Sequence, residues 1–167
     1  STPKNINLVY NKIKDLNPGL IKIVTYANSV TDNFKVLGLL KAAKKKERNL
    51  AAFCMGQYGQ FSRLQSMICG SRIAYGYVND ESAAGQLSLE EMNKIYNIKS
   101  LNKSTKIAGL IGNPVEHSWS HVIQNAAFKK IGFNAVYLKF KVDKLKEFVK
   151  YFRKTDAVGF SVTILHK

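Results

Sequence analysis

The sequence predicts an α/β protein made of two successive parallel-sheet units. Short apolar runs rich in β-branched residues alternate with stretches whose apolar residues recur at helical spacing, a rhythm typical of a parallel sheet or a (β/α) barrel. A polar stretch without periodicity, Ile98 to Thr105, separates one such alternation from the next. The chain has 167 residues, of which 46% are hydrophobic, so it is long enough to fill an ordinary core.

The first unit opens with a strand at Gly19–Ala27, which follows a Pro-Gly break. Asp32 is a suitable N-cap for the next helix, and the lysine run Lys44–Lys46 should end it. The apolar face of that helix consists of Phe34, Leu37, Leu40 and Ala43. A second buried strand, "NLAAFCMG", then leads through a glycine-containing loop to the next helix.

That helix, "FSRLQSMICG", is short and is closed by Gly70. The run "RIAYGYV" is expected to form a third strand. After a polar loop, Ser88 and Glu91 have the spacing of a capping box for the helix "LEEMNKIYN".

The second unit is expected to contain the strand "KIAGLIG", the helix "SHVIQNAAFKKIG", the strand "AVYLKFKV", an amphipathic helix and the strand "AVGFSVTI". The apolar face of the amphipathic helix consists of Leu145, Phe148, Val149 and Phe152. We therefore expect one unit at residues 1–97, a linker at 98–105 and a second unit at 106–167. A complete (β/α)₈ barrel needs about 250 residues, so the first unit would be part of a larger domain.

Charge and composition restrict the possible partners. The formal net charge is +15, from 26 Lys and Arg against 11 Asp and Glu. The lysines are scattered over helix faces rather than gathered with aromatic residues, which argues against nucleic acid and suits small anionic substrates. No segment approaches the roughly 20 apolar residues of a membrane span.

The cysteines and the chain ends add two expectations. Cys54 and Cys69 lie in apolar surroundings, which favours reduced thiols in a reducing compartment, the cytoplasm or a plant plastid. The chain lacks an initiator Met and stops at Lys167 directly after an apolar run, so we expect a piece of a longer protein that could have lost a targeting peptide.

Several side chains of the first unit could form a site. Lys22 stands alone in "LIKIVTY", either as a nucleophile able to form a Schiff base or as a strand-end lysine that reaches solvent. Arg63 could clamp a carboxylate or be a surface arginine. Ser82, Gly85 and Gln86 occupy the loop after the expected third strand, on the side where barrels build active sites. We expect Lys22 at the carboxyl end of its strand, on the same side as Arg63 and this loop, because a shared substrate requires them at one barrel face.

The segments "IKIVTYANS", "CMGQYGQFSRLQSMICGS" and "NDESAAGQLSLEEM" resemble the carboxyl-terminal part of type I 3-dehydroquinate dehydratase, a (β/α)₈ (TIM) barrel, over Gly19 to about Tyr96. The resemblance implies that Lys22 forms the imine and that Arg63 binds the substrate carboxylate. It also implies that Ser82 and Gln86 contact the substrate from the loop that closes over it, and that Met55 lines the same pocket.

Two features of this first unit depart from the family or lack a counterpart. Ala84 stands where the family usually has Pro. The family's general-base histidine and its glutamate partner belong to earlier strands, and nothing in Ser1 to Pro18 can replace them. We therefore expect the dehydration site to be incomplete in this chain.

The stretch "IGNPVEHSWSHVIQN" places two serines directly beyond a strand, where open α/β sheets bind ligands. A turn followed by a helix cap is the alternative explanation. His117 and His121 flank the serines, but no carboxylate or Cys joins them at metal-ligand spacing, and a hydrolase would need a nucleophile elbow that is absent. No metal is expected.

"IAGLIGNPVEHSWSHVIQNAAF" and "GFSVTILHK" resemble the amino-terminal, substrate-binding domain of shikimate dehydrogenase, over residues 106–167. The resemblance implies that Ser118 and Ser120 hold the substrate carboxylate, that Thr163 contacts the substrate and that Lys167 is catalytic. Because the ends of neighbouring parallel strands meet in one crevice, we expect the two serine hydroxyls and Thr163 to face a common pocket. The family usually has Pro and Asn where this chain has Leu165 and Ser161, respectively. The G-x-G-x-x-G fingerprint is absent, so the implied NADP would bind beyond the chain's last residue.

Together, the resemblances predict a segment that spans the junction of a bifunctional enzyme of the shikimate pathway, which makes chorismate and aromatic amino acids. Its lyase half would dehydrate 3-dehydroquinate through a Schiff base, and its NADP-dependent oxidoreductase half would reduce the product, 3-dehydroshikimate, to shikimate. Both sites would be incomplete, so we expect this chain alone to be inactive. The alternatives are a basic, non-catalytic α/β module that binds nucleic acid and a relative that binds sugar acids without chemistry.

Overall fold

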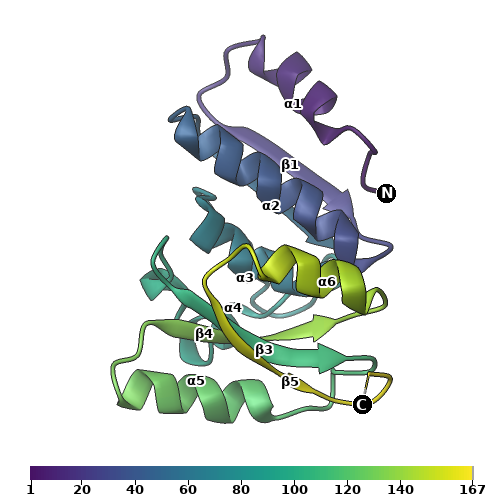
Figure 1. The fold of residues 1–167 in the computed structure, drawn as a ribbon. Coiled ribbons are helices and arrows are strands. Elements are labelled where there is room, and N and C mark those ends of the chain that lie inside the picture. Colours follow the sequence, from purple (N-terminus) through teal and green to yellow (C-terminus); the bar gives the residue numbers. More distant parts are fainter. Residues whose placement is uncertain (167) are drawn as a thin grey trace.

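The protein stacks two parallel sheets with helices between them, as Figure 1 shows in a computed structural model that describes residues 1–166. The smaller sheet pairs β1 (Ile21–Tyr26) with β2 (Leu50–Met55). The larger sheet has the strand order β4 (Ala135–Lys141), β3 (Lys106–Gly112) and β5 (Ala157–Val162). The elements therefore form two α/β units, as the sequence predicts.

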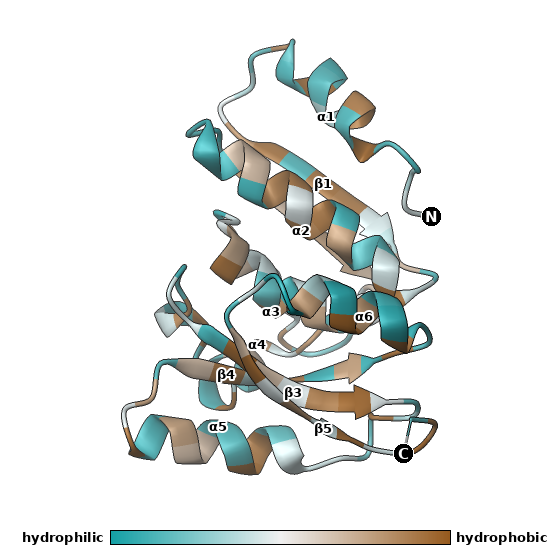
Figure 2. Ribbon diagram, in the orientation of Figure 1, coloured by the Kyte–Doolittle hydropathy of each residue, from teal (hydrophilic) through white to brown (hydrophobic). Residues whose placement is uncertain are grey.

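Helices fill the space between the sheets and cover the outer face of the larger one. The helices of the middle layer are α2 (Val30–Lys45), α3 (Gln60–Cys69) and α6 (Leu145–Phe152). The others are α1 (Ile6–Lys14) beside β1, α5 (Ser120–Lys130) on the outer face of the larger sheet, the short α4 (Leu89–Lys94) and the 3₁₀ helix η1 (Ile98–Ser100). Figure 2 shows the helices two-coloured, with apolar stripes, as expected when one side of each is buried.

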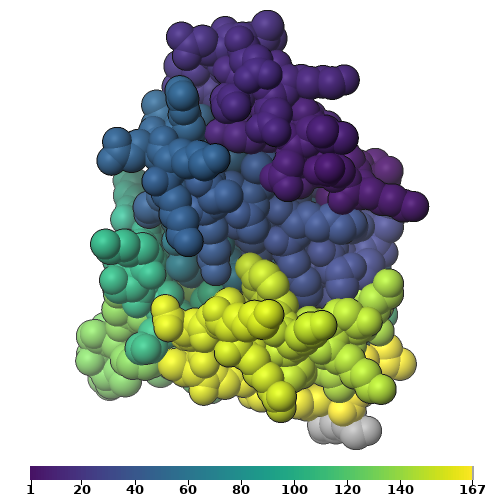
Figure 3. Space-filling model, turned by 45° about the horizontal axis from the view of Figure 1, so that its top comes forward, coloured from purple at the N-terminus to yellow at the C-terminus, as the bar shows by residue number. Residues whose placement is uncertain are grey.

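The two units share one hydrophobic core. Phe140 of β4 is fully buried, and its ring centroid lies 4.7 Å from that of Phe61 in α3. Phe34 of α2 stacks on Tyr151 of α6 with a centroid distance of 4.0 Å. In Figure 3 the yellow surface of the last elements meets the blue surface of α2. The second unit therefore packs directly on helices of the first.

The central strand of the larger sheet, β3, is apolar after Lys106 and is buried on both faces from Ile107 to Gly112. Ile107 and Ile111 face the shared core, whereas Ala108 and Leu110 belong to a second cluster that Phe128 of α5 covers. A strand with helices on both faces is a continuous apolar run rather than an alternating one, as "KIAGLIG" is.

The expected third strand at "RIAYGYV" is wrong. Tyr77 N donates to Leu87 O at 3.1 Å and Leu89 N donates to Tyr77 O at 2.8 Å, so this backbone bonds to the loop that follows it. Among the backbone hydrogen bonds of residues 1–166, one joins this segment to β2, in which Arg72 N donates to Leu50 O. The segment therefore lies beside β2 without extending its ladder.

The expected cap of α2 is also wrong. Ser29 is the N-cap, in an extended conformation, and its side chain accepts from Thr31 N. Asp32 lies in the first turn of the helix, and its carboxylate accepts a hydrogen bond from Asn28 N at 3.0 Å. A negative charge at this end interacts favourably with the helix dipole. The capping box of Ser88 and Glu91 is confirmed.

Two further elements differ from the sequence prediction. Helix α1 was not predicted, although Ile6, Tyr10 and Ile13 have helical spacing and pack on the core. The expected linker at residues 98–105 begins with the 3₁₀ turn η1 instead of being irregular throughout.

Candidate active sites

Lys22 is the second residue of β1 and lies opposite Ala51 of β2. Strand alternation sends Ile21 and Ile23 into the core and leaves Lys22 exposed on the opposite face. Its Nζ lies 3.9 Å from the centroid of the Tyr75 ring, a cation–π contact. We expected Lys22 at the carboxyl end of its strand, and this placement is wrong, because β1 extends four residues further to Tyr26.

Arg63 lies in the first turn of α3 and is 3% exposed. Its guanidinium carbon is 4.7 Å from the centroid of the Phe53 ring, and Phe53 lies 5.7 Å from Tyr75, ring to ring. Lys22 contacts the Tyr75 ring and Arg63 contacts the Phe53 ring, and these two rings contact each other. The two cations therefore lie on the same face of the small sheet. Arg63 is therefore buried, and the expectation of a surface arginine does not hold.

The Arg63 guanidinium lacks partners for two of its groups. Nε and Nη2 are buried and have no hydrogen-bond acceptor among residues 1–166. Burial lowers the pKa of Arg63, and the charge of Glu81 partly opposes this. A buried guanidinium with unsatisfied donors is suited to a carboxylate, whose two oxygens match its planar fork.

The loop with Ser82 and Gln86 is tied to the end of β2. Ser82 Oγ donates a hydrogen bond to Gln86 Oε1 at 2.9 Å, so the two side chains contact each other. Gly56 N donates to Ala84 O at 2.8 Å, directly after Met55, the half-buried last residue of β2. At Gly85 a Cβ would lie 2.4 Å from Gly56 O, so this close approach and the φ of +75° require glycine. The loop thus lies near Arg63, whereas Lys22 lies towards the other end of the strands.

The second site lies at the carboxyl ends of β3 and β5. Ser118, Ser120 and Thr163 line one cavity of about 430 Å³, within the range of small-molecule sites. Ser118 Oγ donates to Ser120 Oγ at 3.0 Å and accepts from Ser120 N at 3.2 Å. The expected meeting of the three hydroxyls in a common cavity is confirmed. Lys167 lies outside the described residues.

The two histidines near the serines have different surroundings. His117 lines the serine cavity. His121 is buried, its Nδ1 lies 3.0 Å from Ser118 O, and its ring stacks on Tyr96 of the first unit at 5.8 Å. Burial and the nearby Lys139 lower the pKa of His121. Among residues 1–166, no group of three His, Cys, Asp or Glu side chains could hold a metal ion.

Sequence reasoning missed a charged cluster between the two sites. A cavity of about 170 Å³ is lined by Glu81 and Gln86 of the first unit and by Glu116, Lys139 and Lys141 of the second. Lys141 Nζ bonds Glu116 at 3.4 Å and also Gln57, which follows β2. The alternation of Lys with Leu and Phe in "AVYLKFK" was the available signal, because it places both lysines on one strand face.

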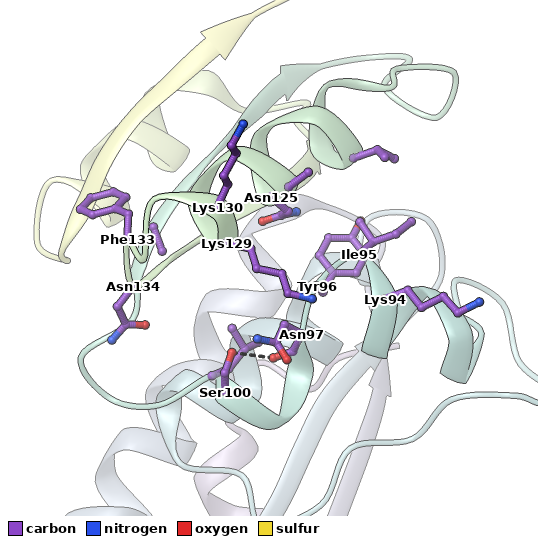
Figure 4. A pocket seen from close by; sticks show the side chains of 14 residues that line it. Lys94, Ile95, Tyr96, Asn97, Ser100, Asn125, Lys129, Lys130, Phe133 and Asn134 are labelled. Carbon is purple, nitrogen blue, oxygen red and sulfur yellow. Dashed lines mark hydrogen bonds between the residues drawn. The ribbon is translucent and has the colours of Figure 1, made fainter.

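A more voluminous cavity lies elsewhere, between α4 with η1 on one side and α5 on the other (Figure 4). Its volume is about 590 Å³, and none of the residues discussed so far except Tyr96 lines it. No sequence motif pointed to this cavity.

The sequence matches two family models. Residues 1–103 match type I 3-dehydroquinase, and residues 110–167 match the shikimate dehydrogenase substrate binding domain. The chain is 32% identical over 158 residues to the bifunctional 3-dehydroquinate dehydratase/shikimate dehydrogenase, chloroplastic, of Arabidopsis thaliana, covering 93% of this chain and 26% of that protein.

Two further comparisons concern one unit each. Over 69 residues the chain is 49% identical to shikimate dehydrogenase (NADP(+)) of Methanocaldococcus jannaschii, covering 40% of this chain and 24% of that protein. The crystal structure of 3-dehydroquinate dehydratase from Geobacillus kaustophilus superposes with a TM-score of 0.50 at 20% identity, covering 60% of this chain and 38% of that one, which shows a shared fold. The chain thus spans about a quarter of the length of these two sequence relatives. Among residues 1–166 no helix has the length and apolar character needed to cross a membrane.

Proposed function

Because the chain belongs to the type I 3-dehydroquinase family over residues 1–103, we propose that it contributes to an enzyme that dehydrates 3-dehydroquinate and then reduces the product, 3-dehydroshikimate. The match of residues 110–167 to a shikimate dehydrogenase domain supports the second activity. The observation that carries the proposal is the 430 Å³ cavity in which Ser118, Ser120 and Thr163 meet. We place the boundary between the units at residues 98–105.

In the dehydratase half, Lys22 is the proposed nucleophile. Its amine, once deprotonated, adds to the ketone carbon of the substrate, and the carbonyl oxygen leaves as water with the two amine protons, which forms a C=N bond. Protonation of the imine nitrogen gives an iminium, which draws electrons from the neighbouring carbon, and the proton of that carbon goes to a base. The adjacent hydroxyl takes up a proton and leaves as water, and a second water then hydrolyses the iminium to release the product and the free Lys22 amine. Residues 1–103 contain no histidine, so this chain does not supply the family's base.

Arg63 is the proposed carboxylate-binding residue of that half. Its buried Nε and Nη2 would gain the acceptors that they lack. Ser82 and Gln86 are proposed to contact the substrate from their loop, and Met55 to line the pocket. Lys22 lies towards the opposite end of the strands from the loop, so the substrate would span the sheet face between them.

In the dehydrogenase half, Ser118 and Ser120 are the proposed carboxylate ligands. Their hydroxyls bond each other at 3.0 Å, and both can rotate to donate to a carboxylate in the cavity. Thr163 is proposed to hold a substrate hydroxyl on the opposite wall. Lys167, outside the described residues, is proposed to take the proton of the reacting hydroxyl.

NADP is the proposed hydride carrier of the whole enzyme, as the name of the Methanocaldococcus relative suggests. A dinucleotide needs a glycine-rich turn between a strand and a helix, whose backbone cradles the pyrophosphate. The turn after β3 is Gly112–Asn113–Pro114, and no strand of residues 1–166 is followed by G-x-G-x-x-G. These residues do not fit the cofactor, and no hydride-transfer step is assigned to them. The chloroplastic Arabidopsis relative supports a plastid location for a plant source, with the cytoplasm proposed otherwise.

Shikimate binding to the 167-residue chain tests the proposal. Addition of shikimate should shift the backbone NMR signals of Ser118, Ser120 and Thr163 in a saturable way. The double variant Ser118→Ala with Ser120→Ala should weaken binding about tenfold or more, because two hydrogen bonds to a charged group are lost. Ser104→Ala, an exposed serine in the loop before β3, is the matched control and should bind normally. Equal binding by all three proteins would refute the assignment of this cavity.

A further inference from the structure

The cavity between α4 with η1 and α5 joins the two units at a place that neither candidate active site uses. One wall comes from α4 and η1 of the first unit and the other from α5 of the second. At about 590 Å³ it lies within the volume range of small-molecule sites.

The walls of this cavity are largely apolar. Ile95 and Leu101 line it from the first unit, and Val122, Ala126 and Phe133 from the second. Phe133 is 40% exposed, so part of its ring remains uncovered in the folded chain. Such walls suit an apolar ring, whose burial is favourable at about 25 cal/mol per Å².

One cation is available at the cavity, on the exposed side chain of Lys129. Three lysines line it, and none of the lining residues is acidic. Lys94 is neutralised by Glu90 at 2.7 Å, and in Figure 4 its side chain extends away from the cavity. Lys130 also extends away, whereas Lys129 reaches across towards Tyr96 and Asn97. Lys129 has no salt-bridge partner among residues 1–166.

The neutral polar groups of the walls are mostly engaged. Asn125 is buried, and its amide donates to Tyr137 O and accepts from Tyr137 N. Ser100 Oγ donates to Asn97 O at 2.8 Å, and Asn134 Oδ1 accepts from Thr105 Oγ1 at 2.9 Å. The free charge of Lys129 is therefore the dominant polar feature.

We propose that this junction cavity binds a small organic monoanion that carries an apolar ring. The ring lies between α5 and the α4–η1 segment, and its carboxylate pairs with Lys129. A single unpaired cation favours one negative charge over a dianion such as a phosphate ester, because the second charge would have no cation of its own beside the apolar walls.

Benzoate is the test ligand, with the 167-residue chain followed by ¹H–¹⁵N NMR. Benzoate should produce saturable shifts at Tyr96, Asn97 and Val122. Lys129→Gln should weaken binding about tenfold, because a charge-assisted hydrogen bond is lost, and uncharged benzyl alcohol should bind similarly weakly. Lys130→Gln is the matched control, with the same charge change on a side chain that points away, and should stay within about twofold.

A second variant tests the cavity rather than the charge. Ala126 lies on the exposed side of α5, so Ala126→Trp should fill the space without disturbing the core and should abolish the shifts. Absence of benzoate shifts, full binding by the Ala126→Trp variant, or equal weakening by Lys129→Gln and Lys130→Gln would overturn the proposal. The Ser118→Ala with Ser120→Ala variant should bind benzoate normally in this cavity, which separates this test from that of the proposed function.

Discussion

Replacing Arg63 by Met should stabilise the folded chain while removing the proposed carboxylate-binding group. Arg63 is 3% exposed and leaves two buried N–H groups, Nε and Nη2, without acceptors. Each unsatisfied buried donor costs about 1–3 kcal/mol. Met has a similar length and no donor, so it removes both costs and keeps most of the packing.

The opposing contribution is the contact with Phe53. The guanidinium carbon lies 4.7 Å from the ring centroid, and a cation–π contact contributes about 0.5–2 kcal/mol. The balance favours Met by about 1 kcal/mol or more, which corresponds to a rise in Tm of about 2–4 °C per kcal/mol for a chain of this size.

Urea and thermal unfolding of the two proteins measure this difference. Arg72→Met is the matched control, because Arg72 is exposed and its Nε donates to Asn49 Oδ1 at 3.0 Å, so its effect should stay within about 0.5 kcal/mol. A loss of stability above about 1 kcal/mol in Arg63→Met would refute the reasoning, since it would show that the native guanidinium is satisfied.

Four further outcomes are expected. The 167-residue chain should turn over 3-dehydroquinate at least about 10²-fold more slowly than a complete dehydratase in an absorbance assay, because residues 1–103 hold no histidine base; comparable turnover would contradict this. Phe140→Ala should cost about 3–5 kcal/mol in urea unfolding followed by two probes, and separate transitions of the two units would speak against a shared core. Burial raises the pKa of both cysteine thiols from the ordinary 9.0 to about 11. Between these two pH values unfolding releases the thiol protons, so the free energy of unfolding should fall as the pH rises from about 9 to about 11. The native thiols should react slowly with iodoacetamide at pH 8, and rapid labelling would contradict this. In a complete enzyme, Lys167→Ala should chiefly lower kcat, whereas the double serine variant should chiefly raise KM, and unchanged kcat in the lysine variant would remove its proposed role.

Much of the fold could be predicted because local pattern and tertiary packing agree. "KIAGLIG" is apolar after its first residue and lies between two helical layers. Gly70 ends α3 in the left-handed region with a φ of +103°. The prediction failed at "RIAYGYV", where composition favours a strand but Tyr77 bonds to Leu87 and Leu89 instead. Strand propensity depends on an available partner strand, which a single sequence does not show.

The candidate sites were predictable to different degrees. Ser118, Ser120 and Thr163 were found because the carboxyl ends of neighbouring parallel strands form one crevice. The burial of Arg63 and the 590 Å³ cavity could not be found, because both depend on packing between segments distant in sequence. Lys22 was expected on the same side as Arg63, and the contacts through Tyr75 and Phe53 agree with this, but it lies near the amino end of β1, because the sequence pattern does not fix the strand boundary.

Bonds between the units hold the carboxyl ends of both sheets on the same side of the molecule. Asp143 follows β4, and its carboxylate accepts from Ser29 Oγ at 3.2 Å and from Val30 N at 3.1 Å, directly after β1. Lys141 at the end of β4 bonds Gln57 just after β2. Since ligands in parallel α/β sheets bind beyond the carboxyl ends of strands, these contacts orient the two candidate sites together rather than at opposite poles. The helices α2, α3 and α6 lie in the middle layer because apolar residues of both sheets pack against them.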